Sequence, residues 1–91
     1  MVEIHWKSEG PHAPVSDHEF YELRLFDFGE TVAPRFVVRE IHGLWSASAQ
    51  QIQWKGYQDE TCRTSDEANR RLGIRRASIV DEGFAYTTLV E

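Results

Sequence analysis

Alternation of apolar and polar residues with a period of two is the feature that most restricts how this 91-residue chain can fold. Near the N-terminus, Val2, Ile4 and Trp6 alternate with polar neighbours, and residues 19–28 alternate in the same way. Successive side chains of a β-strand point to opposite faces, so this spacing is typical of strands with one buried face. The pattern predicts a strand over residues 2–6 and a longer one over residues 19–28.

Two further strands are predicted in the next part of the chain. Pro34 can stand at the start of a strand, where its missing N–H is tolerated, and the predicted third strand covers about residues 35–42. Gly43 interrupts the pattern, and a fourth strand is expected to end near Trp54. Residues 8–17 contain two prolines and a glycine without periodicity, which predicts a loop.

A single short helix is predicted after the fourth strand. Either Thr64 or Ser65 can serve as its N-cap, and Glu67 stands three residues after Thr64, as in a capping box. Gly73 is the expected terminator, which predicts a helix of two to three turns.

The C-terminal part is predicted to form a hairpin. Residues 74–80 and 84–90 are the two strands, and residues 81–83 form a three-residue turn that ends in glycine. The fold class is therefore α+β, a mainly antiparallel and curved β-sheet in the order ββββαββ with one short helix.

Length and composition predict one small domain over residues 1–91. The chain has 41% hydrophobic and 27% charged residues, which matches ordinary globular proteins and excludes a disordered or fibrous class. Three Trp, three Tyr and five Phe can form a core at this length without disulfides or a metal.

The cysteine count and the termini predict a cytoplasmic protein. Cys62 is the single cysteine, so no intrachain disulfide can form. The N-terminus has no basic and apolar signal segment, and no stretch approaches eighteen apolar residues, so no membrane contact is expected. Eight of the ten basic residues are Arg, a bias common in GC-rich bacteria.

Arginines are concentrated in residues 63–76, which makes an anion site one hypothesis for this chain. The stretch has a net charge of +3, from five arginines against two acidic residues: Arg63, Arg70, Arg71, Arg75 and Arg76 against Asp66 and Glu67. Arginine pairs bidentately with phosphate, which favours an anion or nucleic-acid contact. The favoured interpretation is compensation of the helix dipole plus salt bridges, because the sequence pI is about 5.3 and nucleic-acid domains are usually strongly basic.

The segment Trp54-Lys55-Gly56-Tyr57 resembles the corresponding tetrad of chromodomains, and residues 36–41 resemble the strand that opens that fold. The resemblance implies that Phe36, Trp54 and Tyr57 form an aromatic cage for a methylated ammonium group. The residues after the tetrad depart from the family pattern, since they lack its Thr-Trp-Glu-Pro element. The favoured interpretation is a strand that ends here, turns at Gly56 and carries aromatic side chains in the core or at its rim.

No residue spacing in the chain indicates a metal site or a catalytic site. His5, His12, His18, His42 and Cys62 are candidate ligand types, but their spacing along the chain does not form a zinc-ligand motif. A helix N-terminus next to Cys62 could activate its thiol, but an inert thiol is the favoured interpretation. The chain has no glycine-rich phosphate loop or nucleophile elbow, so no cofactor and no catalytic residue are predicted.

These observations predict a small noncatalytic binding or accessory protein that contacts a protein partner through a sheet edge or an aromatic rim. Pairing of the same edge with an identical chain would give a homodimer. The alternative is an anion or nucleic-acid binder that uses Arg70, Arg71, Arg75 and Arg76, and the chromodomain-like cage is a more remote one.

Overall fold

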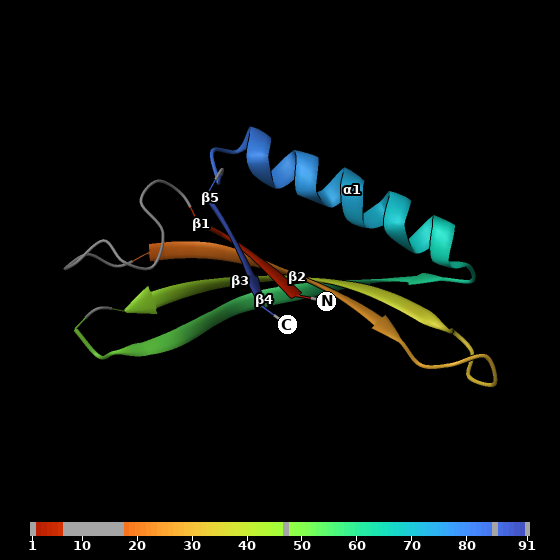
Figure 1. The fold of residues 1–91 in the computed structure, drawn as a ribbon. Helices are drawn as coiled ribbons and strands as arrows, with labels where there is room; N and C mark the ends of the chain where they lie inside the picture. The colour runs from red at the N-terminus through yellow and green to blue at the C-terminus, as the bar shows by residue number, and fades with distance from the viewer. Residues whose placement is uncertain (1, 7–17, 47, 85, 91) are drawn as a thin grey trace.

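The computed structural model describes residues 2–6, 18–46, 48–84 and 86–90, which form one antiparallel sheet with a helix on one face (Figure 1). The predicted α+β class is therefore confirmed. In chain order the elements are β1 (Val2–Trp6), β2 (His18–Asp27), β3 (Phe36–Ser46), β4 (Gln51–Cys62), α1 (Ser65–Asp81) and β5 (Tyr86–Val90). The order across the sheet is β4-β3-β2-β1-β5, so β4 and β5 are its edges. The predicted loop over residues 8–17 lies outside the described residues.

Strands β3 and β4 are longer than predicted. β3 continues through Gly43 to Ser46, and β4 continues past Trp54 to Cys62. Glycine is tolerated inside β3 because the ring of Phe20, on the paired strand β2, packs where a glycine Cβ would lie. The two strands pair along their whole length, which supplies the hydrogen bonds that hold the polar half of β4 in the sheet.

The predicted strand over residues 74–80 is wrong, because α1 runs without interruption from Ser65 to Asp81. Its buried residues Ala68, Leu72 and Ile79 are four and seven positions apart, the spacing of one helix face. Gly73 inside the helix costs about 1 kcal/mol relative to Ala, less than the roughly 1.5–3 kcal/mol gained by burying a side chain such as Ile79. The element order is therefore ββββαβ.

The start of the helix agrees with the sequence, whereas its end does not. Thr64 is the N-cap, and its hydroxyl accepts a hydrogen bond from the backbone N–H of Glu67 at 3.2 Å. The last turn contains no basic residue, so the expected dipole compensation by Arg70 and Arg71 is absent because both lie in the middle of the helix.

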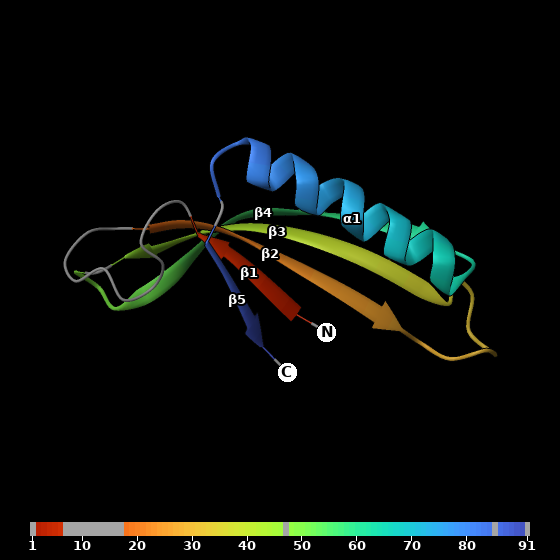
Figure 2. The ribbon, with the colours of Figure 1, turned by 45° about the horizontal axis from the view of Figure 1, so that its top comes forward.

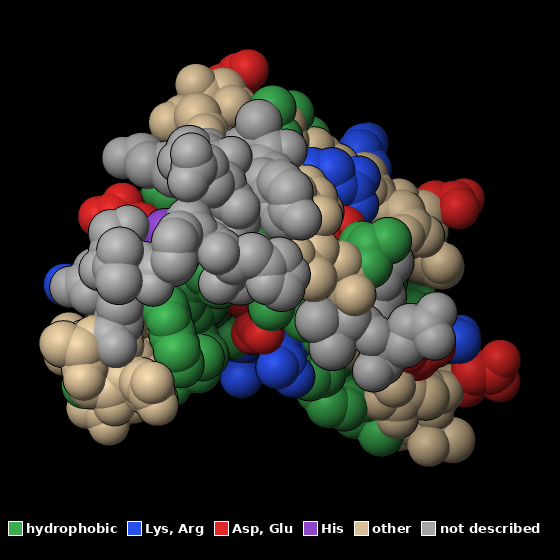
Figure 3. All heavy atoms as spheres, turned by 60° about the vertical axis from the view of Figure 1, so that its left-hand side comes forward, with side chains coloured by type: hydrophobic (Ala, Val, Ile, Leu, Met, Phe, Trp, Pro, Cys, Tyr) green, Lys and Arg blue, Asp and Glu red, His purple; other side chains and the backbone are tan. Residues whose placement is uncertain are grey.

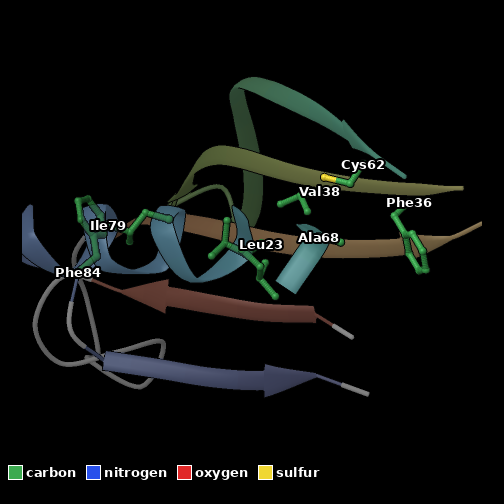
Figure 4. Close-up of a cluster of buried hydrophobic side chains, with 8 residues drawn as sticks. Leu23, Phe36, Val38, Cys62, Ala68, Ile79 and Phe84 are labelled. Carbon is green, nitrogen blue, oxygen red and sulfur yellow. The ribbon is translucent and has the colours of Figure 1, made fainter. Parts of the chain in front are cut away.

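The main core lies between α1 and the face of the sheet that it covers (Figure 4). Its buried members come from three strands, the helix and the segment after it: Leu23, Phe36, Val38, Cys62, Ala68, Leu72, Ile79 and Phe84. Figure 2 shows α1 lying along β2, β3 and β4, while β1 and β5 extend beyond it. No described helix or strand covers the opposite face, which we call the helix-free face.

A network of polar side chains joins β1, α1 and β5. Arg76 donates two hydrogen bonds to the carboxylate of Glu3, at 2.7 and 2.9 Å, and His5 Nε2 lies 2.9 Å from the same carboxylate. The other ring nitrogen of His5 lies 3.1 Å from the hydroxyl of Thr87. Glu3 and His5 are buried, so the network satisfies polar groups that the short strand β1 places on the helix side of the sheet.

Candidate functional site

Three exposed apolar side chains lie along the edge strand β4 on the helix-free face. Ile52, Trp54 and Tyr57 have 43%, 59% and 65% of their surface exposed. Because β4 is the last strand of the sheet, its outward N–H and C=O groups have no neighbouring strand in the described part of the chain. We call these three residues the β4 aromatic surface.

A β-bulge places Trp54 and Tyr57 on the same face. The register between β3 and β4 shifts at this point, so that Lys55 is an extra residue. Residues three apart in a regular strand point to opposite faces, and the extra residue reverses this alternation. The interpretation of this segment as a strand end that turns at Gly56 is therefore wrong, since the strand continues to Cys62.

The β4 aromatic surface rests on a buried ring of β2, which in turn contacts a buried ring of β1. Phe20 of β2 contacts Trp54 edge to face at a centroid distance of 5.9 Å, and it contacts Trp6 of β1 at 5.2 Å. Phe20 is 2% exposed and Trp6 is 8% exposed, whereas Trp45 of β3 is half-buried. Among Trp6, Trp45, Trp54 and Tyr57, the exposed pair is thus Trp54 and Tyr57.

An ion pair borders the surface beyond Tyr57. Arg39 donates two hydrogen bonds to Asp59, at 2.8 and 2.9 Å, and its guanidinium lies 4.8 Å from the centroid of the Tyr57 ring. The hydrogen bonds from Arg39 hold the pKa of Asp59 below its ordinary value, so both groups are charged at neutral pH. In Figure 3, hydrophobic side chains flank an indentation on the side away from the helix, with acidic and basic side chains at its inner end.

A second exposed apolar group lies at the other end of the helix-free face. Phe28 is 51% exposed and stacks on Phe26, and Val32 nearby is 46% exposed. Phe26, Phe28 and Val32 line a hollow of about 440 Å³. Phe28 and Val32 lie in the connection between β2 and β3, and the hollow is also lined by Arg39 of β3 and Asp59 of the edge strand β4.

The structure does not bring the three residues of the chromodomain-like cage together. Phe36 pairs with Cys62 at the far end of β4 and is 5% exposed in the core under α1. Trp54 and Tyr57 lie on the helix-free face. The register of β3 and β4, which the resemblance did not provide, separates the rings.

The arginines of the predicted anion site are divided between different surroundings. Arg75 lies 3.2 Å from Glu40 and 3.2 Å from Glu60, and Arg76 is bound to Glu3. Arg70 and Arg71 are exposed on the helix and have no ion pair among the described residues. Acidic residues of the sheet therefore neutralise two of the four guanidinium groups.

The described histidines have separate partners. His5 belongs to the Glu3 network, His18 lies edge to face against Trp6, and His42 stacks on Tyr21 at a centroid distance of 4.6 Å. Within the described residues, no three His, Cys, Asp or Glu side chains come together as metal ligands. His12 lies outside the described residues. The described chain also has no helix with the length and apolarity needed to cross a membrane.

The thiol of Cys62 is expected to react slowly in the native protein. It is 2% exposed in the core, and burial raises its pKa above the ordinary value, with Glu67 and Glu60 adding to the rise. Alkylation with iodoacetamide at neutral pH should be at least about tenfold slower than in urea-unfolded protein, as measured by intact mass. Equal rates in the two states would show that the thiol is accessible.

Comparison of the chain with protein-family models, with curated proteins and with solved structures gives no match in any of the three.

Proposed function

We propose that this chain is a noncatalytic protein-binding module that receives an extended segment of a partner protein on the edge strand β4. The observation that carries the proposal is the row Ile52, Trp54 and Tyr57, which is exposed on an edge strand next to an open row of backbone groups. Strand addition uses the backbone hydrogen bonds for affinity and alternate side chains for specificity. Exposed aromatic residues at such an edge are typical anchors of a protein interface.

Charge and cysteine content support the rest of the proposal. A net charge of −5 favours a protein partner over a nucleic acid, whose phosphates would be repelled. The single buried Cys62 fits a reducing compartment, and we place the module in the cytoplasm. The same edge of a second copy is the other strand that could add to β4, which would give a homodimer.

The proposal is tested with peptides selected from a displayed library of random 12-residue sequences. The selected peptides should bind wild-type protein and slow amide hydrogen exchange within residues 51–62. Binding should weaken at least about tenfold when Trp54→Ala and Tyr57→Ala are combined, because two aromatic anchors are removed. Isothermal titration calorimetry measures the affinities.

The matched control is Leu89→Ala, which removes a 71% exposed side chain from the other edge strand, β5. This variant should bind the selected peptides as wild type does. Peptides that protect β5, or that bind the double variant unchanged, would contradict the proposal. Sedimentation velocity of wild type and double variant shows whether a second copy occupies the edge.

A further inference from the structure

A hollow lies beside the edge strand on the other side of the sheet, the side that α1 covers. Its volume is about 270 Å³, and its walls are Tyr21 of β2, Glu40 and His42 of β3, and residues 55–58 of β4. A neighbouring hollow of about 330 Å³ shares Tyr21 and Glu40 and continues toward the C-terminal half of α1. A strand added to β4 would therefore have this recess next to its helix-side residues.

The polar groups around the two hollows include buried atoms without a hydrogen-bond partner among the described residues. His42 Nε2 is shielded from solvent and has no hydrogen-bond partner among the described residues, and the same is true of Glu60 Oε2. An unsatisfied buried polar atom costs about 1–3 kcal/mol, so a donor that reached these atoms would be favourable. Arg75 Nε is an unpaired donor in the same region, but the guanidinium to which it belongs already holds Glu40 and Glu60.

The charges around the hollows favour a cation. Glu40, Glu60 and Glu82 supply three negative charges, against Arg75 and the exposed Lys55. The ring of Tyr21 is held by ring contacts, because it stacks on His42 and lies edge to face against Phe84. Arg75 is occupied by two carboxylates, and Lys55 has no ion pair among the described residues.

We infer that the hollow lined by Tyr21, Glu40 and His42 receives a lysine or arginine side chain of the strand that docks on β4. This inference depends on the proposed function, since the docked strand brings the side chain to the recess. Side chains alternate along an added strand, so apolar residues face the β4 aromatic surface while the basic residue points to the helix side. A basic side chain has a long apolar stem that can cross the rim and place its charged end among the acceptors.

The test uses the peptides obtained in the library selection. Each peptide is compared with a second peptide that differs from it at one position. Selected sequences should share one Lys or Arg in an otherwise alternating apolar pattern, and each is compared with a copy that carries norleucine there. The norleucine peptide should bind about tenfold more weakly to wild type. The difference should shrink to less than about threefold in His42→Phe, which keeps a ring to stack on Tyr21 and removes Nε2.

A second variant tests the role of charge by making the surroundings of the recess more negative. Lys55→Gln removes a positive charge at the rim and should strengthen binding of the basic peptide about threefold, while the norleucine peptide is unchanged. Circular dichroism confirms that both variants keep the fold.

The possible failures are distinguishable. Peptides that protect β4 and depend on Trp54, but bind equally well with norleucine, would refute the cation site and leave the proposed function standing. If replacing the basic residue by norleucine weakens binding equally in wild type and in His42→Phe, the basic side chain binds elsewhere. This result would also refute the site. The absence of any peptide that protects β4 would remove both the site and the function.

Discussion

Arg76→Met is expected to lower the free energy of unfolding at neutral pH by about 2–3 kcal/mol. The substitution leaves the buried carboxylate of Glu3 without the guanidinium that binds both of its oxygens. Without Arg76, the buried charge of Glu3 has lost its guanidinium partner. Because Arg76 is partly exposed, the effect is expected to be smaller than for a fully buried pair. Urea denaturation followed by tryptophan fluorescence measures the change.

The effect of Arg76→Met should also depend on pH. Burial by itself raises the pKa of Glu3, but hydrogen bonds from Arg76 and His5 outweigh it, so the pKa lies below its ordinary value of 4.5. A carboxyl group whose pKa is lowered by folding contributes stability above the unfolded pKa and loses it as pH falls through the folded value. The difference between wild type and variant should therefore be full at pH 7 and shrink below about pH 4.5.

Glu3→Gln is the control for this network. The amide keeps a hydrogen-bonding group beside Arg76 but removes the titrating carboxyl. The part of the acid destabilisation that comes from protonation of Glu3 should therefore be absent in this variant. A wild-type protein and an Arg76→Met variant with parallel stability curves from pH 7 to pH 3 would show that the pair does not contribute in this way.

Gly43→Ala is expected to destabilise the protein by about 1–3 kcal/mol, although it adds a single methyl group. A Cβ at this position would lie 2.4 Å from Cζ of Phe20 and 2.8 Å from its Cε1. The ring cannot move away freely, because it is held between Trp6 and Trp54. Thermal and urea unfolding of the variant measure the loss.

A double-mutant cycle assigns the cost of Gly43→Ala to this contact. Phe20→Leu shortens the side chain, so the alanine substitution should cost at least about 1 kcal/mol less in the Phe20→Leu background than in wild type. The β4 aromatic surface rests on the same ring, so Gly43→Ala should also reduce Trp54-dependent peptide binding. Additive effects of the two substitutions on stability would mean that the methyl group is accommodated elsewhere.

The local signals in the sequence were sufficient for most of the strands and for the start of the helix. The alternation around Val2–Trp6 and along residues 19–28 predicted β1 and β2 because a period of two is a property of neighbouring residues. Thr64 was one of two candidate caps, with Ser65, and the structure selects Thr64, whose hydroxyl accepts from a backbone N–H three residues away. The end of the helix was missed because Ile79 is buried against partners distant in sequence, and that burial outweighs the signal of Gly73.

Local sequence patterns predicted the α+β class, most of the strands and the aromatic candidates Trp54 and Tyr57. The faces that those side chains take depend on how distant strands pair. The bulge at Lys55 puts Trp54 and Tyr57 together, and the register of β3 with β4 removes Phe36 from them. The ion pair between Glu3 and Arg76 could not be predicted for the same reason. The two residues are 73 positions apart, and strand register and packing bring them together without any signal in their local sequence.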